Sequence, residues 1–332
     1  MVTVGFHASH EQLRPSDALA AVRHATAAGF QAAMCSDHLA PWSARQGESG
    51  FAWSWLGAAL EATDVSFGVV SAPGQRYHPV IAAQAIATLG EMYPGRFWAA
   101  LGSGENVNEH VTGDRWPDKP TRDARLLECV EVMRALLAGE EVTHDGLIRV
   151  DRARLWSLPE QMPALVGAAV SAQTAGIVGG WADGLITVNQ PLDTLERVIG
   201  AFRDGGGDGK PVYVQVHVSW APDEDTALAI AHDQWRSNVF SSELAWNLAF
   251  PEQFDAAAEH VTPDAVREPV LVSADLDQHV EWLSAIAALG VDGLYLHHVG
   301  QRQDEFVDAF AEHVLPHLTG NGMSTGAERN AS

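Results

Sequence analysis

Short apolar runs alternate with longer amphipathic segments along most of the chain. The apolar runs predict buried strands at 2–7, 32–35, 65–70, 97–101, 164–168, 184–188, 211–219 and 293–297. The amphipathic segments predict helices at 15–28, 79–93, 121–137, 172–180, 193–202 and 303–318. Strands that alternate with helices predict a parallel sheet covered by helices. Eight predicted strands in this alternation favour an α/β fold of the (β/α)8 barrel type, and a doubly wound open sheet is the alternative.

Two segments interrupt this alternation. A β-hairpin is predicted over 142–150, because Asp145 and Gly146 form a strong tight-turn signal. A helical insertion rich in aromatic residues is predicted over 223–267. Since no linker divides the chain, we predict a single domain over 1–318, followed by a disordered Gly-, Ser- and Asn-rich tail over 319–332.

Composition narrows the class of protein. The chain has 332 residues, 46% of them hydrophobic, and a net charge of −23, which argues against nucleic acid and anionic membrane surfaces as partners. Met1 leads directly into a predicted strand and no apolar run reaches the length of a membrane span, so no signal peptide or membrane segment is expected. Cys35 and Cys129 make no disulfide framework, and a cytoplasmic location is expected.

Two polar motifs follow predicted strands directly. Residues 36–42 (Ser-Asp-His-Leu-Ala-Pro-Trp) follow the second strand, and residues 102–109 (Gly-Ser-Gly-Glu-Asn-Val-Asn-Glu) follow the fourth. In a barrel, the loops at the carboxyl ends of the strands meet at one face. His38, with Trp42 four residues on, and Glu105 in a glycine-flanked turn therefore predict one pocket. These residue types indicate hydride or proton chemistry on a flat ring.

Each of these residues also has an ordinary structural explanation. His38 can be a surface or hydrogen-bonded loop residue, and Glu105 can interact with the positive amides at a helix start. Glu11, after the first strand, can be an acidic residue that precedes a helix. The connection over 69–79, after the third strand, is either a turn or a lid over a ligand. These explanations leave open why two such motifs end two different strands.

Other chemistries lack their motifs. His297 and His298 are neighbours on a strand and should point to opposite faces, and no His-Glu-x-x-His or Cys-x-x-Cys spacing occurs, so no metal site is predicted. The chain has no phosphate-binding Gly-x-x-x-x-Gly-Lys-Ser/Thr loop and no Gly-x-Gly-x-x-Gly after the first strand. The one Gly-x-Ser-x-Gly match, at 322–326, lies in the C-terminal tail and follows no predicted strand, so no hydrolase nucleophile turn is predicted.

The motifs together resemble the luciferase-like superfamily of flavin- and coenzyme F420-dependent barrel enzymes. Within it, the chain is most similar to the F420-dependent glucose-6-phosphate dehydrogenase subfamily, and especially to a branch expected to use FMN instead. The resemblance spans 5–318 and is densest at Ala8 to Gln12, Ser36 to His38, Pro41 to Trp42, Ser54 to Trp55, Arg76 to Tyr77, Gly104 to Glu105 and Asn108 to Glu109.

The resemblance implies a role for each motif. His38 corresponds to the base that takes a proton from a substrate hydroxyl as hydride leaves the same carbon. Glu105 corresponds to the acid facing the N1 side of the ring, Trp42 lies beside the reacting centre, and Glu11 is a further carboxylate in the pocket. The implied cofactor-binding residues are Val69, Val70, Ser103, Gly104, Asn108, Gly167, Ala168 and Ala169. A cis peptide is implied between Val69 and Val70, pressed against the ring.

Three positions depart from the pattern of the subfamily. Two lysines that bind the substrate phosphate correspond here to Pro191 and Ala256, so a sugar phosphate is not expected as substrate. The Gly-Gly turn near the cofactor phosphate appears as Gly167-Ala168-Ala169. The cofactor is accordingly expected to be FMN or F420, and FMN is favoured.

We therefore expect an oxidoreductase that transfers hydride between the ring and a small organic substrate. The pocket wall is predicted to contain Trp42, Trp55, Tyr77, Trp116 and the aromatic residues of the insertion, which are Trp235, Phe240, Trp246, Phe250 and Phe254. An FMN-dependent monooxygenase that uses molecular oxygen and a non-catalytic flavin-binding barrel are the alternatives. The intact acid–base pair counts against the second, because binding alone needs none. A homodimer is left open.

Overall fold

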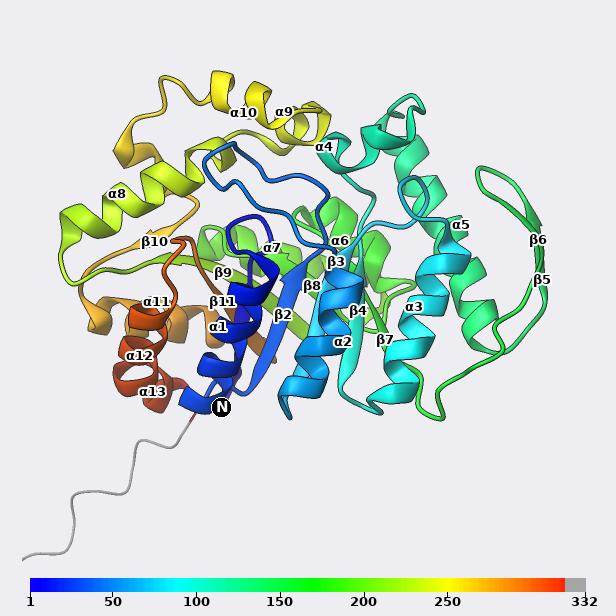
Figure 1. Cartoon of the computed structure of the whole chain (residues 1–332), viewed down its shortest axis with the longest axis horizontal. Coiled ribbons are helices and arrows are strands. Elements are labelled where there is room, and N and C mark those ends of the chain that lie inside the picture. The colour runs from blue at the N-terminus through cyan, green and yellow to red at the C-terminus, as the bar shows by residue number, and fades with distance from the viewer. Residues whose placement is uncertain (320–332) are drawn as a thin grey trace, which may run out of the picture.

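Eight parallel strands close into a barrel in the computed structural model, which describes residues 1–319 (Figure 1). The strands are β1 Thr3–Ala8, β2 Ala32–Ser36, β3 Ser66–Ser71, β4 Phe97–Leu101, β7 Ala164–Ala168, β8 Leu185–Val188, β9 Val212–Ser219 and β11 Gly293–His298. β11 closes the barrel because it pairs with both β9 and β1. Each strand begins and ends within one residue of its predicted range. The predicted barrel is confirmed, and the open-sheet alternative is wrong.

Helices surround the barrel on the outside. They are α1 Pro15–Ala28, α2 Ala52–Ala62, α3 Pro79–Met92, α5 Lys119–Leu137, α6 Ala172–Gly179, α7 Leu192–Phe202, η2 Arg203–Gly207, α11 Leu276–Ala287, α12 Asp304–His313 and α13 Leu315–Thr319. The predicted helix over 303–318 is interrupted at Val314, because Pro316 has no N–H to donate to the preceding turn. Helices α2 and α11 were not predicted. The predicted tail over 319–332 lies outside the described residues, except for Thr319, which ends α13.

Both predicted insertions are present. Strands β5 Val142–Asp145 and β6 Arg149–Ala153 form the hairpin. The helical insertion contains α8 Glu224–Trp235, η3 Arg236–Asn238, α9 Ser242–Asn247, α10 Pro251–Ala257 and η4 Pro263–Arg267, and it ends at β10 Leu271–Val272. Two further short helices, α4 Asn106–Glu109 and η1 His110–Thr112, follow β4. Figure 1 shows α9 beside α4 at one end of the barrel, the end where the strands finish, and α10 lies at the same end.

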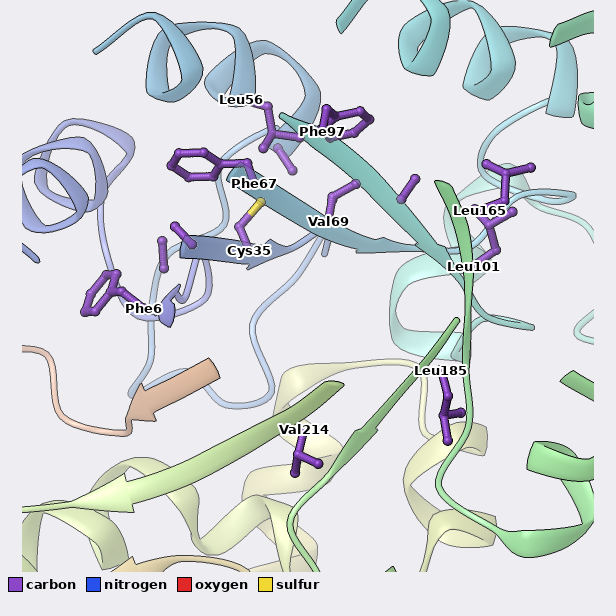
Figure 2. Packing of buried hydrophobic residues seen from close by; sticks show 14 of the residues in the cluster. Phe6, Cys35, Leu56, Phe67, Val69, Phe97, Leu101, Leu165, Leu185 and Val214 are labelled. Carbon is purple, nitrogen blue, oxygen red and sulfur yellow. The ribbon is translucent and has the colours of Figure 1, made fainter. Parts of the chain in front are cut away.

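The core has two shells, which follow from the alternation of side chains along a strand. Outward-facing residues pack against the surrounding helices, as Figure 2 shows for Phe67 and Val69 of β3 near Leu56 of α2. Inward-facing residues such as Val70 and Trp98 form a separate cluster inside the barrel. A residue's position within its strand therefore decides whether it can reach the barrel interior.

Three aromatic rings fill the amino-terminal half of the barrel interior. Trp98 stacks on Tyr213 at 5.1 Å and meets the edge of Tyr295 at 5.7 Å. Gly68 is required beside them, because a Cβ at this position would lie 2.0 Å from Cζ2 of Trp98. The aromatic rings leave the carboxyl-terminal half of the interior as the place for a pocket.

The peptide between Val69 and Val70 differs from expectation. No peptide bond within residues 1–319 is cis. The strand pairs regularly on both sides at this point, with Val69 beside Cys35 and Ala99. An uninterrupted ladder contains no bulge that could accommodate the implied cis bond, so this expectation was wrong. Within the same residues, no helix has the length and apolar character needed to cross a bilayer.

Candidate active site

A cavity of about 560 Å³ lies at the carboxyl ends of the barrel strands. Its size is that of a pocket for a cofactor or small ligand. Of the site residues expected from the sequence, those in its wall are Glu11, His38, Trp42, Val70, Ser103, Gly104, Glu105, Asn108, Ala168 and Ala169. Val69 and Gly167 are not in the wall. Val69 faces the helices, and Gly167 packs so closely against Val178 that a Cβ would lie 2.2 Å from it.

His38 lies between two carboxylates from different loops. Its Nδ1 is 3.0 Å from Oε1 of Glu11, and its Nε2 is 3.6 Å from Oε2 of Glu105. Glu11 is buried, whereas the side chains of His38 and Glu105 keep 15% and 24% of their exposure. The loops after β1, β2 and β4 therefore bring the three residues together, with the Nε2 side of the ring facing the cavity wall that contains Glu105.

The carboxylates change the proton affinity of the imidazole. Burial lowers the pKa of His38, but the charges of Glu11 and Glu105 outweigh it and raise the pKa to about 9. Burial raises the pKa of Glu11, yet His38 outweighs this effect and holds that pKa well below its usual range. For Glu105, burial raises the pKa, and Glu11 adds to the rise although His38 opposes it. At neutral pH the site therefore holds an imidazolium beside an ionised Glu11.

Trp42 forms the aromatic wall beside His38. The two rings meet edge to face at 5.0 Å, and Phe254 of α10 packs edge to face on the other side of Trp42 at 5.5 Å. From the insertion, Trp235, Phe240 and Trp246 line the cavity as predicted. The insertion thus contributes aromatic side chains to the cavity wall, and through Phe254 it also supports Trp42.

Other predicted wall aromatics lie elsewhere, so the expectation for them was wrong. Trp55 is buried in the core beside α1 and donates to the carbonyl of Pro15 at 2.9 Å. Trp116 stacks on Arg122 at 4.5 Å, and Phe250 packs on His110. Tyr77 also lies outside the wall, because its hydroxyl is turned toward a buried carboxylate.

That carboxylate, Asp37, holds the loop that carries His38. Its oxygens accept hydrogen bonds from Trp53 Nε1 at 3.1 Å, Ser71 Oγ at 2.7 Å and the Tyr77 hydroxyl at 3.0 Å. The side chain is 0% exposed. The sequence shows Asp37 only as the neighbour of His38, because its hydrogen-bond partners are dispersed along the chain. These three donors hold Asp37 in place and thereby restrain the backbone that carries His38.

The described cavity wall contains one arginine, Arg76, and one lysine, Lys119, and each already forms an ion pair with a carboxylate of the protein. The Arg76 guanidinium lies 3.5 Å from Asp37 Oδ2 and 3.6 Å from Glu109 Oε1, and its backbone N–H donates to Glu109 at 2.6 Å. Lys119 forms an ion pair with Asp123 one turn along α5. An anionic ligand would therefore have to compete with carboxylates of the protein for either cation.

Three histidines, which sequence reasoning did not assign to the site, lie in the wall as well. They are His7, His217 and His297, from β1, β9 and β11. Burial lowers the pKa of His7 to about 4 and that of His217 to about 3, and it holds the pKa of His297 well below the usual value. We call these residues the neutral histidine group. His298 points the other way, as predicted, and stacks on Phe306 at 4.8 Å.

Comparison with known proteins assigns the chain to a family. The model of the luciferase-like monooxygenase family matches residues 1–293. The chain belongs to this family. The luciferase-like resemblance drawn from the motifs is thereby confirmed, and the protein is an enzyme of the oxidoreductase class.

Relatives of this family member are F420-dependent. It is 35% identical over 326 residues to the F420-dependent glucose-6-phosphate dehydrogenase of Microbacterium testaceum (strain StLB037), with 95% of this chain and 96% of that protein covered. It is 30% identical over 328 residues to the enzyme of the same name from Mycobacterium tuberculosis (strain ATCC 25618 / H37Rv), with coverage of 95% and 97%. The structure of an F420-dependent secondary alcohol dehydrogenase in complex with an F420-acetone adduct matches with a TM-score of 0.90 and 31% identity. This match covers 96% of this chain and 99% of that chain.

Monooxygenases of the luciferase-like family match only at lower identity. The monooxygenase RslO1 from Streptomyces bottropensis has a TM-score of 0.72 and 18% identity, with 96% of this chain and 100% of that chain covered. A likeness at this level shows the fold alone. The preference for FMN taken from the sequence finds no support in the more similar relatives, whose names specify F420.

Proposed function

We propose that this luciferase-like enzyme is an F420-dependent dehydrogenase. It would move a hydride between the cofactor and the carbon of a small alcohol or carbonyl compound that has no phosphate group. The observation that carries the proposal is the His38 ring, held between Glu11 and Glu105 in the wall of a cofactor-sized cavity. The similarity to F420-dependent relatives over nearly the whole chain supports the choice of cofactor.

The cavity wall fits such a cofactor. Val70 and Ile186 give apolar surface for a flat ring, and the wall continues through 168–170 to the first turn of α6. Backbone N–H groups at a helix start favour an anion, so this end of the wall suits the phosphate of the cofactor. Gly104, with φ of +82°, brings backbone close to the cavity where a Cβ would lie 3.1 Å from Glu109. When bound, F420 accepts a hydride from an alcohol carbon or returns one to a carbonyl carbon.

His38 would exchange a proton with the substrate oxygen. Glu11 lies at Nδ1 and orients the ring, which leaves Nε2 as the atom for proton exchange. With its pKa raised to about 9, His38 holds a proton at neutral pH and is ready to donate it to a carbonyl oxygen. Alcohol oxidation requires the deprotonated ring. Oxidation should therefore become faster as the pH rises toward 9, and carbonyl reduction should become slower above that value.

The charges of the wall favour a substrate without phosphate. Arg76 and Lys119 are paired, and the neutral histidine group supplies no cation at neutral pH. Pro191, which lines the cavity, occupies a position where the related enzymes are expected to have lysine. Each missing charge-assisted hydrogen bond should cost about 1.5–3 kcal/mol of binding. A neutral alcohol needs none of these cations.

The test is anaerobic turnover with F420. The purified protein is mixed with F420 and a series of short secondary alcohols and their ketones, and the visible absorbance of the cofactor is followed in both directions. Reduction of F420 by a neutral alcohol, with glucose 6-phosphate a poorer substrate, is the expected result. Hydride transfer with FMN but none with F420 would refute the cofactor assignment, and preferential use of glucose 6-phosphate would refute the substrate class.

A further inference from the structure

His38 and Glu105 face each other although no strand pairing sets their separation. His38 lies two residues beyond the end of β2, and Glu105 lies four residues beyond the end of β4. Strand β3 separates β2 from β4 in the barrel, so the two loops have no ladder in common. The short distance between the side chains must therefore depend on contacts between the loops themselves.

Asn108, in the short helix α4, makes such a contact with both loops. Its Oδ1 accepts hydrogen bonds from the backbone N–H of Leu39 at 2.8 Å and of Ala40 at 3.5 Å. Its Nδ2 donates to Oε2 of Glu105 at 3.2 Å. A backbone N–H can only donate and an ionised carboxylate can only accept, so these partners fix which end of the amide points where. Asn108 is 4% exposed, which leaves its amide little freedom to seek water instead.

The Glu105 oxygen that Asn108 holds is the one that faces His38. Oε2 of Glu105 receives the Asn108 amide and lies 3.6 Å from His38 Nε2. Asn108 is itself held in place, since its backbone N–H donates to the Glu105 carbonyl at 3.0 Å. The buried Asn108 side chain thus hydrogen-bonds both Leu39, which follows His38, and the Glu105 carboxylate, which faces His38.

We propose that Asn108 is a positioning residue that holds the Glu105 carboxylate at its distance from the His38 ring by bridging the two loops that carry them. Its significance for catalysis rests on the proposed function, but the bridge itself is a property of the cofactor-free protein. Sequence reasoning assigned Asn108 to cofactor binding, and the bridge gives it a distinct role.

The bridge has a consequence for proton affinity. The charged groups around His38 and Glu105 are Glu11 and Arg76, together with His38 and Glu105 themselves. Within this set Asn108 adds a neutral donor, which favours the ionised form of Glu105. Loss of the bridge should let Glu105 move away, which weakens the field that raises the pKa of His38.

Two variants separate the two ends of the amide. Asn108→Ala removes both the bond to Leu39 and the bond to Glu105. Asn108→Asp keeps an acceptor for the Leu39 N–H but places a second carboxylate where Glu105 had a donor. Asn106→Ala is the matched control, because Asn106 lies in the same helix and its amide bonds the Asn247 carbonyl at 3.0 Å, away from His38.

The primary measurement is NMR titration of the His38 ring and the Glu105 carboxyl in the cofactor-free variants, with thermal unfolding as a check on folding. In Asn108→Ala the pKa of His38 should fall, and in Asn108→Asp the pKa of Glu105 should rise while the Leu39 contact persists. Asn106→Ala should match the wild type. Wild-type titration of both groups in both Asn108 variants would overturn the proposal, and so would equal shifts in the control.

Turnover provides the second measurement. A displaced catalytic group can cost about 10²-fold in rate, so kcat of Asn108→Ala with the best alcohol should fall by about 10- to 100-fold. Because the residue acts through His38 and Glu105, KM should change much less than kcat. If NMR shows the shifts but the wild type transfers no hydride to F420, the proposed function fails and the positioning role stands. Shifts without any change in kcat would overturn the catalytic part of the inference.

Discussion

His38 and the neutral histidine group belong to one cavity, but they have opposite charge states at neutral pH. His38 lies beside Glu11 and Glu105, and its pKa is raised to about 9. His7 and His217 lie deeper on the barrel strands, where burial lowers their pKa to about 4 and about 3. Burial opposes the charged form in both regions, so the difference comes from two carboxylates close to one ring. One region of the cavity is thereby able to exchange a proton, and the other supplies polar surface without charge.

Removal of His38 should have the largest effect on activity. Loss of a general acid–base side chain costs about 10²–10⁴ in rate, so His38→Ala should lower turnover by that factor. The affinity for the cofactor should change little, because the ring acts on the substrate. His24→Ala is the control, since His24 is a surface residue paired with Asp308. Stopped-flow absorbance of F420 measures the hydride step. A rate in His38→Ala close to that of the control would contradict the assignment.

The neutral histidine group should make the fold sensitive to acid. Between pH 6.5 and about 4, His7 and His217 stay neutral in the folded protein but gain protons when the chain unfolds. The free energy of unfolding should therefore fall as the pH falls through this range, by about 1.4 kcal/mol per pH unit for each such group. Urea unfolding at pH 7 and pH 5 measures the change. His7→Gln should reduce the pH dependence, and an unchanged slope in this variant would argue that His7 is charged in the fold.

Glu11→Gln should reduce the contrast between the two regions. The charge of Glu11 is the largest effect that raises the pKa of His38, so this pKa should fall below 9 in the variant. The raised pKa stabilises the folded wild type below about pH 6.5, and this contribution is lost as the pH rises through 9. Glu11→Gln should lose that dependence, and its alcohol oxidation should reach its maximum at a lower pH. Glu48→Gln, at an exposed surface pair, is the control. NMR titration of His38 gives the direct readout, and an unchanged pKa would refute the role of Glu11.

The smallest effect is expected from adding a cation to the cavity. Pro191→Lys adds an ammonium group to a cavity wall whose described lysine and arginine side chains are both in ion pairs. One charge-assisted contact should strengthen inhibition by inorganic phosphate or glucose 6-phosphate by about tenfold. Neutral alcohols should show no matching gain. Inhibition constants for both classes measure the difference, and strong phosphate inhibition of the wild type itself would show that another cation is available.

The sequence predicted the barrel well because its strands are short apolar runs with abrupt ends. It missed α2, whose buried face holds Trp53 and Leu56 and whose start lacks a side-chain cap. It also missed α11, although Asp275 caps that helix by accepting from the N–H of Asp277. Local signals therefore sufficed for the strands, whereas two of the surrounding helices, α2 and α11, were overlooked.

The site was only partly predictable. His38, Glu105 and Glu11 follow strand ends and share recognisable motifs, so sequence reasoning assigned them to the pocket that the structure displays. The neutral histidine group was missed because its members are distant in sequence and meet only when β1, β9 and β11 become neighbours. Val69 was included because the resemblance implied a cis peptide between Val69 and Val70, although alternate residues of a strand face opposite sides. The expected catalytic roles, the homodimer and the cytoplasmic location stay predictions.

Titration of the cofactor-free protein with F420 and with FMN tests the central claim most directly. Fluorescence quenching gives both affinities under the same conditions, with His38→Ala as a variant whose affinities should match the wild type. We expect F420 to bind at least tenfold more tightly than FMN, a difference of about 1.4 kcal/mol. FMN binding that is tighter than F420 binding by the same factor would contradict it.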